Sequence, residues 1–256
     1  MSILQTLVLA VIQGLTEFLP VSSKTHLLFA QHFMGTGEPD LFLIVVLHAG
    51  SLAAITVYYA RSWLALLRDR RREIPRLVVG TVPAVAAVLL LKSRLEPLYG
   101  NLLLASGLLI LNGAFLFLSE RLGREKEGVP EAPLWKALVV GLAQACALLP
   151  GISRSGSTIG TGCLLGLRRG EAVRFSFFLG AVAIAGALVF KGRELLRGQG
   201  TPDPLPIMIG AAAAFGVSLA AIKVVEILSL RGKLSLFALY CALAGAGGLV
   251  YGFLRG

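Results

Sequence analysis

Charged residues are scarce in this chain. Asp, Glu, Lys and Arg make up 15% of its 256 residues, whereas soluble domains carry about 25%. Apolar residues make up 56%, and the mean hydropathy is +0.80. The 30 glycines fit this composition, because transmembrane helices tolerate glycine well. The composition therefore argues against a soluble enzyme and indicates an integral membrane protein.

Cysteine is also sparse, and the common catalytic motifs are missing. Cys146, Cys163 and Cys241 lie singly in apolar stretches without metal-ligand spacing, so we interpret them as packed thiols. The sequence has no Walker loop, HExxH or GxGxxG motif. No positive residue precedes the first apolar run, which argues against a cleavable signal peptide.

Two polar stretches interrupt the apolar sequence. The first, QGLTEFLPVSSKTH, runs from Gln13 to His26, and the second, LLPGISRSGST, runs from Leu148 to Thr158. Polar groups are costly in hydrocarbon, so an ionisable residue in a membrane-buried segment indicates a functional site. The two stretches therefore predict where the chemistry lies.

The two stretches are related by an offset of 130 residues. At this offset the matching pairs are Pro20 and Pro150, Ser23 and Ser153, Lys24 and Arg154, Gly50 and Gly180, and Gly80 and Gly210. We interpret the chain as one membrane domain built by duplication, with repeats at about 1–125 and 130–256. Internal repeats with interrupted helices in matching places are typical of membrane proteins whose site lies at the repeat interface.

Six apolar runs predict membrane spans, since a span needs about 20 apolar residues. They lie at about 41–60, 77–92, 101–118, 174–190, 205–223 and 235–254. Residues 2–34 and 134–167 instead break at Pro20 and Pro150. A ten-residue half-helix rises only ~15 Å, so each broken region predicts a re-entrant hairpin buried in protein. The predicted fold is all-α, with six transmembrane helices and two re-entrant helix hairpins.

Charge orients this arrangement. Residues 61–76 hold six arginines, which predicts a cytoplasmic segment. Alternation puts three more segments on that side, and together the four hold 16 of the 24 Lys and Arg: 61–76, 119–136, 168–174 and 223–233. Both termini then lie outside, and the three crossings between the hairpins give the repeats inverted topology. The net charge of +10 follows largely from this bias, so it suits anionic lipid headgroups and calls for no nucleic-acid partner.

Ten polar side chains of the two stretches are predicted to share one site. The first stretch supplies Gln13, Glu17, Ser22, Ser23, Lys24 and His26, and the second supplies Ser153, Arg154, Ser155 and Thr158. Arginine favours bidentate phosphate contact, and helix N-termini attract anions. Glu17 and His26 have the chemistry to move protons or to activate a nucleophile. The pattern favours a phosphate or diphosphate that is reached from within the bilayer.

Several of these residues also have structural interpretations. Glu17 could be a neutral structural carboxyl, His26 a packing residue, and Arg154 an internal counter-ion of Glu17. Lys24 could be an unusual surface substitution. Gln13 lies one turn before Glu17 on the same helical face, where it could orient the carboxylate or satisfy the backbone.

Other polar residues are assigned structural roles more readily. Ser155 and Thr158 suit capping or backbone hydrogen bonding better than reaction. His32 and His48 are interpreted as structural.

The motifs GLTEFLPVSS, followed by a histidine, and PGISRSG resemble those of the undecaprenyl-diphosphate phosphatases, the bacitracin-resistance proteins of bacteria. The resemblance covers essentially the whole chain, including FSFFLG at 175–180. It implies six spans plus two re-entrant hairpins, in agreement with the predicted topology. It also implies hydrolysis of undecaprenyl diphosphate in the bacterial inner membrane, with the site facing the periplasm, to recycle the carrier lipid of cell-wall synthesis.

Roles follow from the chemistry and the resemblance together. We assign catalytic roles to Glu17 as proton acceptor, Arg154 as diphosphate ligand, and Ser23 and His26, which with water are the alternative nucleophiles. The predicted substrate-binding residues are Gln13, Ser22, Lys24, Ser153, Ser155 and Thr158. The chain departs from the family at Lys24-Thr25, where a small residue and then Gly or Ala are usual, and it has no proline near 182–184.

A transporter is the competing function class. Inverted repeats with broken helices also describe alternating-access carriers, so a polyprenyl-phosphate flippase is the alternative. A small-ion channel is weaker, because nothing indicates a continuous polar pore. No cofactor is certain, although a divalent cation, Mg or Ca, bridging Glu17 and phosphate is left open, and so is a homodimer.

Overall fold

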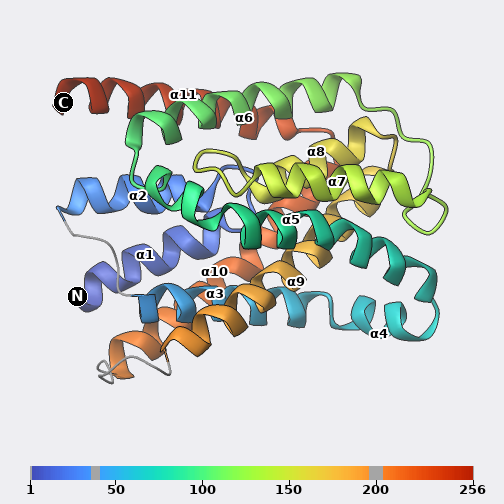
Figure 1. Cartoon of the computed structure of the whole chain (residues 1–256), viewed down its shortest axis with the longest axis horizontal. Coiled ribbons are helices and arrows are strands. Elements are labelled where there is room, and N and C mark those ends of the chain that lie inside the picture. The colour runs from blue at the N-terminus through green and yellow to red at the C-terminus, as the bar shows by residue number, and fades with distance from the viewer. Residues whose placement is uncertain (1, 36–40, 196–203, 256) are drawn as a thin grey trace.

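The computed structural model describes residues 2–35, 41–195 and 204–255, and the secondary structure there is almost entirely helical. The exceptions are turns, two 3-10 segments and one isolated bridge between Glu127 and Leu167. The helices lie side by side along the long axis of the molecule (Figure 1). The predicted all-α class is confirmed.

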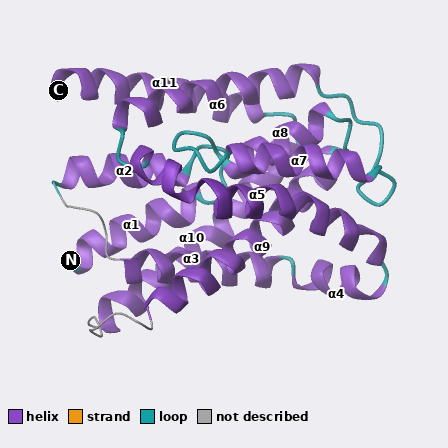
Figure 2. Ribbon diagram, in the orientation of Figure 1, coloured by secondary structure: helices purple, strands orange, loops and turns teal. Residues whose placement is uncertain are grey.

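Each of the two broken regions forms a helix hairpin. The first consists of α1 (Ile3–Thr16) and α2 (Ser23–Met34), and the second consists of α7 (Leu134–Cys146) and α8 (Arg154–Leu164). Figure 1 shows the hairpins reaching the middle of the molecule from opposite ends. Figure 2 shows loop segments in the interior at their turns. The breaks predicted at Pro20 and Pro150 are therefore confirmed.

Each of the two turns contains a residue with a positive φ. Ser22 adopts a positive φ of 66°, and Gly151 has a φ of 97°. Glycine reaches that region without strain, and a Cβ at residue 151 would also collide with Leu108 of the neighbouring helix. The second turn thus needs glycine for its backbone angle and for its close packing.

Six longer helices surround the hairpins. They are α3 (Leu41–Tyr58), α5 (Ile74–Leu95), α6 (Leu102–Leu122), α9 (Arg169–Leu195), α10 (Pro204–Leu230) and α11 (Leu234–Arg255). Among the described residues, five of them are long and apolar enough to cross a membrane. The count rises to six if α3 and the short α4 (Ala60–Arg68), which meet at a 65° bend, form one span.

Helix packing follows the repeat. Helix α5 packs against α7, and α10 packs against α1, so equivalent pairs meet at the offset of 130. Helices α6 and α11, which are also equivalent at this offset, pack against each other. The aromatic rings of Phe18, Phe177 and Tyr59 cluster in the core and attach the first hairpin to α9.

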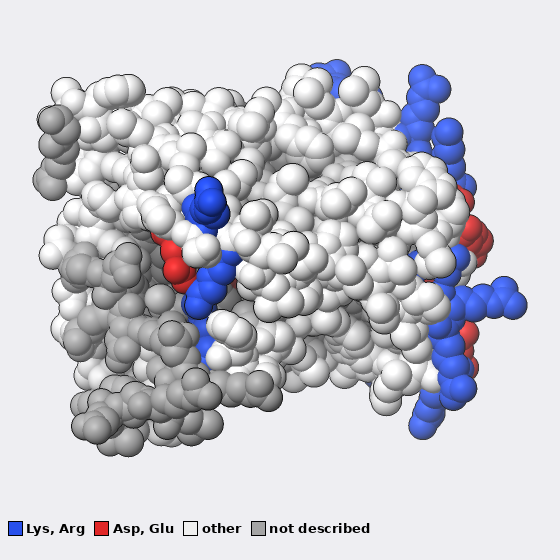
Figure 3. All heavy atoms as spheres, viewed as in Figure 1, with Lys and Arg blue, Asp and Glu red and all other residues white. Residues whose placement is uncertain are grey.

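Charged side chains gather at one end of the molecule. Figure 3 shows most of the Lys and Arg atoms there, with acidic atoms among them. This end includes α4 and an ion-pair network in which Arg174 contacts Glu73 at 3.0 Å and Glu171 at 2.7 Å. It is the end that the sequence predicts to be cytoplasmic.

Candidate functional site

The tips of the two hairpins satisfy each other's backbone groups. Ser155 Oγ of the second hairpin donates to the carbonyl oxygen of Leu19 at 3.0 Å. Asn112, from α6, bridges the tips: its Nδ2 donates to Pro20 O at 2.9 Å, and its Oδ1 accepts from Ser153 N at 3.0 Å. Sequence reasoning missed Asn112, although a lone amide in an apolar helix was the available signal.

Glu17 lies at the centre of this contact. It follows the last turn of α1, and 8% of the residue is exposed. Its Oε1 accepts from Arg154 Nη2 at 2.9 Å. Its Oε2 accepts from Ser23 Oγ at 3.0 Å and from Gln13 Nε2 at 2.9 Å. A buried charge needs a partner of opposite sign and filled hydrogen bonds, and here the second hairpin supplies the charge.

Arg154 is placed by the start of α8 and by a glycine on α9. It is the first residue of α8, which Ser153 caps by accepting from Gly156 N at 3.1 Å. A Cβ at Gly180 would collide with the guanidinium of Arg154. Gly180 is one of the repeat anchors, and in the structure it makes room for the arginine to reach Glu17.

Ser22 and Ser23 point to different partners. Ser23 begins α2 and donates to Glu17, which is the geometry of a nucleophile beside its base. The hydroxyl of Ser22 is buried and lies 3.0 Å from Thr25 Oγ1 within the turn. Ser22 therefore shapes the first tip, whereas Ser23 faces the carboxylate.

His26 is directed toward α11. Its Nδ1 lies 2.8 Å from the carbonyl oxygen of Ser22, and its Nε2 lies 2.8 Å from Tyr240 Oη. A carbonyl can only accept, so Nδ1 carries the proton and Nε2 of the neutral ring accepts from the tyrosine. The rings of His26 and Tyr240 also stack, with centroids 5.5 Å apart. Sequence reasoning missed Tyr240, which no motif marked.

Lys24 crosses to the second hairpin. Its Nζ donates to the carbonyl oxygen of Leu148 at 3.0 Å and lies 4.5 Å from the ring centroid of Tyr99. Lys24 thus lies beside both tips, where a backbone carbonyl oxygen and an aromatic ring accommodate its positive charge.

The remaining predicted hydroxyls make structural hydrogen bonds. Ser153 Oγ and Ser155 Oγ both donate to Leu19 O, at 3.4 and 3.0 Å. Thr158 Oγ1 lies 2.6 Å from Ser176 Oγ and donates to Arg154 O at 2.8 Å. These contacts match the structural interpretation of Ser155 and Thr158.

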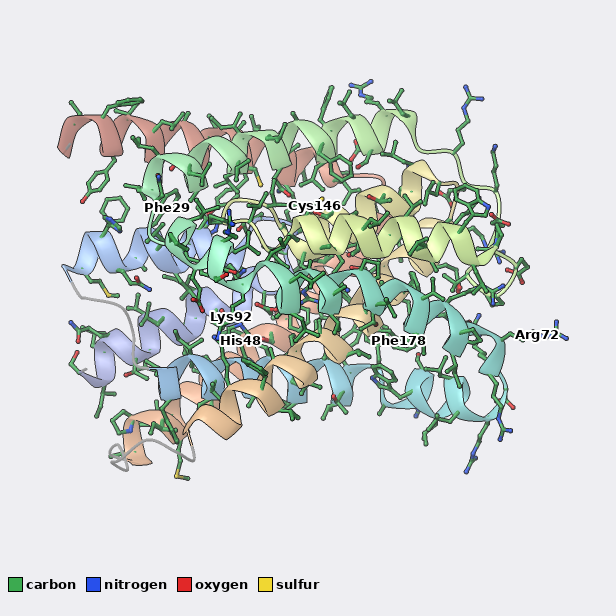
Figure 4. All side chains as sticks on the ribbon, viewed as in Figure 1. Phe29, His48, Arg72, Lys92, Cys146 and Phe178 are labelled. Carbon is green, nitrogen blue, oxygen red and sulfur yellow. The ribbon has the colours of Figure 1, made fainter. Side chains whose placement is uncertain are left out.

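His48 of α3 also faces Glu17. Figure 4 labels its side chain. Its Nε2 lies 3.8 Å from Glu17 Oε2, and its Nδ1 lies 2.8 Å from the carbonyl oxygen of Ile44. Sequence reasoning treated His48 as structural and did not predict its position beside Glu17; an ionisable residue within an apolar span was the signal that marked it.

The described residues do not bring together a set of side chains that could hold a metal ion by themselves. Across the described residues, no group of three or more His, Cys, Asp or Glu side chains converges. A Mg or Ca ion at Glu17 would take its other oxygen ligands from substrate phosphate and water.

The sequence matches proteins of one family along nearly its whole length. The family described as Bacitracin resistance protein BacA matches residues 6–247. A protein of Rhodopirellula baltica named Undecaprenyl-diphosphatase is 40% identical over 246 residues, 95% of each chain. Proteins of the same name from Syntrophotalea carbinolica and Methanobrevibacter smithii are 40% identical over 256 residues and 34% identical over 268 residues. These alignments cover 96% of this chain and, respectively, 97% and 96% of the relatives.

Proposed function

The chain belongs to the family of Bacitracin resistance protein BacA, and on that premise we propose how its residues act as an undecaprenyl-diphosphatase. The protein hydrolyses undecaprenyl diphosphate to undecaprenyl phosphate and inorganic phosphate, which recycles the carrier lipid of cell-wall synthesis. One observation carries the proposed mechanism: where the hairpin tips meet, Glu17 accepts hydrogen bonds from Ser23 at 3.0 Å and from Arg154 at 2.9 Å.

Arg154 binds the diphosphate in this mechanism. Its planar guanidinium can hold two phosphate oxygens at once, and it stays charged throughout. The buried position strengthens this contact as negative charge shifts in the transition state. Lys24 lies beside the tips and supplies a second positive charge to the diphosphate.

Ser23 is the proposed nucleophile, and Glu17 is its base. The oxygen of Ser23 attacks the terminal phosphorus while its proton passes to Glu17 Oε2. The bond from that phosphorus to the bridging oxygen breaks, and undecaprenyl phosphate leaves. After Glu17 has released that proton to solvent, it takes a proton from a water molecule whose oxygen attacks the phosphoserine. The bond between phosphorus and Ser23 Oγ breaks, Glu17 returns the proton to Ser23 Oγ, and inorganic phosphate leaves. The orientation of His26 toward Tyr240 favours Ser23 over His26 in this role.

The other predicted binding residues position these groups. Gln13 donates to Glu17 and orients it. The hydroxyls near the tips fix the two turns between which the diphosphate binds: Ser22, Ser153, Ser155 and Thr158.

The proposed topology places this site toward the outside of the inner membrane. The arginine-rich end is cytoplasmic by the charge rule. The first hairpin then enters from outside, and the second enters from inside. Helices α1, α2, α3, α5 and α6 correspond to α7, α8, α9, α10 and α11 at the offset of 130, which supports an inverted-topology repeat. Anionic lipids would neutralise the cytoplasmic end, and a homodimer stays a prediction.

Phosphate release by the purified protein in detergent tests this function. We expect turnover of undecaprenyl diphosphate without a sealed bilayer, and none after Glu17→Gln. A carrier would give the opposite pattern: no phosphate release in detergent, and lipid movement across vesicles that survives Glu17→Gln.

A further inference from the structure

The imidazole of His48 has a fixed proton on one side and a carboxylate on the other. Nδ1 lies 2.8 Å from Ile44 O, so Nδ1–H donates to that carbonyl. Nε2 of the neutral ring then carries the lone pair, and it lies 3.8 Å from Glu17 Oε2. Proton-transfer contacts are often long before substrate binds and tighten afterwards. The geometry therefore aims the basic nitrogen of His48 at Glu17.

A proton arrives on Glu17 in every turnover of the proposed mechanism. The nearby cations are poor acceptors for it, because the guanidinium of Arg154 and the ammonium of Lys24 carry donors and no free lone pair. Histidine is the side chain that exchanges a proton near neutral pH. The side chain of His48 is 28% exposed against 7% for Glu17, so His48 is the more accessible of the two.

We propose that His48 is a proton-relay residue that acts through Glu17. This inference rests on the proposed role of Glu17 as proton acceptor. The Oε2–H bond of Glu17 breaks and an N–H bond forms at Nε2 of His48, which becomes an imidazolium while Glu17 returns to a carboxylate. The imidazolium then loses the Nε2 proton to a water molecule, which carries it away as hydronium. Both residues are thereby reset for the next proton.

Charged groups near the relay lie on several helices. Glu17, at the end of α1, lies 3.8 Å from the imidazole and pairs with Arg154 on α8 at 2.9 Å, and Lys24 on α2 interacts electrostatically with Glu17. Lys191 on α9 interacts electrostatically with Lys24. On α10, Glu226 bonds Tyr58 at 2.6 Å, ten residues along α3 from His48.

Tyr58 and His48 are roughly 15 Å apart along α3, at the helical rise of about 1.5 Å per residue. At the start of α9, Arg174 pairs with Glu73 and Glu171, and Arg169 pairs with Glu125. Among these groups, Glu17 is the one whose contact with the imidazole is direct.

The test is steady-state phosphate release from undecaprenyl diphosphate between about pH 5 and about pH 8. His48→Gln keeps an amide that can bond Glu17 but cannot carry a proton. We expect kcat to fall on the order of tenfold with KM unchanged, below the full range of general acid–base effects. The limb of the pH profile that reports the neutral imidazole should disappear. Imidazole added to His48→Ala should restore part of the lost kcat.

His32→Gln is the matched control. His32 makes the same contact with the carbonyl four residues earlier, Nδ1 to Leu28 O at 2.9 Å, but it lies toward the far end of α2. Its kcat and pH profile should equal those of the wild type. Melting curves of all variants in detergent would separate misfolding from relay loss, because imidazole cannot rescue an unfolded protein.

Two outcomes would overturn the relay. In the first, His48→Gln has the wild-type kcat and pH profile. In the second, its kcat falls equally at every pH and imidazole does not rescue His48→Ala, which would make His48 a packing residue. A different result addresses the proposed function: normal turnover of Glu17→Gln would remove Glu17 as proton acceptor, whatever the His48 variants do.

Discussion

Replacing Arg154 by lysine separates two roles that the wild-type side chain combines. As a counter-ion, Arg154 bonds Glu17 through Nη2 at 2.9 Å, in a pair whose side chains are 18% and 7% exposed. As a phosphate ligand, it supplies a planar fork of donors. Lysine keeps the charge but presents a point ammonium instead of a fork. Arg154→Lys should therefore preserve much of the ion pair with Glu17 but lose one of the two hydrogen bonds to phosphate.

The expected loss of kcat/KM follows from that missing hydrogen bond. A hydrogen bond to a charged group contributes about 1.5–3 kcal/mol. Loss of one such bond in the transition state lowers kcat/KM by about 10- to 150-fold, at about 1.36 kcal/mol per decade. The thermal midpoint should change little by comparison, because positive charge remains opposite Glu17.

The assay is phosphate release with kcat and KM determined separately, beside melting of the same samples in detergent. Arg121→Lys on α6, whose guanidinium lies over the Phe117 ring at 5.2 Å, is the control and should retain full activity. If the kcat/KM of Arg154→Lys stays within about twofold of wild type, the loss is smaller than the removal of one charged hydrogen bond would cause. Arg154 then acts as a point charge, and the bidentate argument is wrong.

Three further changes test other parts of the site. Glu17→Gln should abolish phosphate release without loss of folded protein, and wild-type turnover would remove its role as base. Asn112→Leu leaves Ser153 N unsatisfied and leaves Pro20 O with the Cys241 thiol as its remaining donor. It should lower the free energy of unfolding by about 1–3 kcal/mol; an unchanged melting curve would mean that the tips hold together without Asn112. Gly180→Ala should reduce phosphate release by displacing the Arg154 guanidinium. Gly107→Ala, where a Cβ would meet nothing within 4 Å, is its control, and equal activity of the two glycine variants would contradict the steric argument.

The hairpins could be predicted from the sequence because their signals are local. Proline at residues 20 and 150 disrupts helical hydrogen bonding, and the apolar runs on either side are too short to span a bilayer. Polar residues at each break added the chemistry. The position of each break therefore followed from short windows of sequence, and so did the gathering of most of the predicted site residues at the hairpin tips.

The bend after α3 was not predictable in the same way. The apolar run at 41–60 reads as one straight span, yet the helix ends at Tyr58 and turns by 65° into α4. Tyr58 and Tyr59 bond Glu226 of α10 at 2.6 and 3.5 Å. Such contacts between residues far apart in sequence leave no periodic pattern, so local reasoning cannot detect them.

The same limit applies to His48 and Tyr240. Each lies in an apolar helix without a motif, and its role depends on which residue it meets: Glu17 for His48, and His26 for Tyr240. Burial arguments identify such residues as unusual, but only the three-dimensional arrangement identifies the partner.

Lys24 stands at the position equivalent to Arg154 in the proposed repeat. At the offset of 130, Lys24 and Arg154 are equivalent, and each reaches across to the opposite hairpin: Lys24 to Leu148 O and Arg154 to Glu17 Oε1. Their targets are nearly equivalent too, since Glu17 corresponds to Ala147, the neighbour of Leu148. The two crossings thus share one geometry but differ in chemistry, because a carboxylate stands at residue 17 and an alanine at residue 147. The proposed repeat thus relates the positions of the two cations at the tips. In the proposed mechanism, the single carboxylate makes the Arg154 side the reactive one.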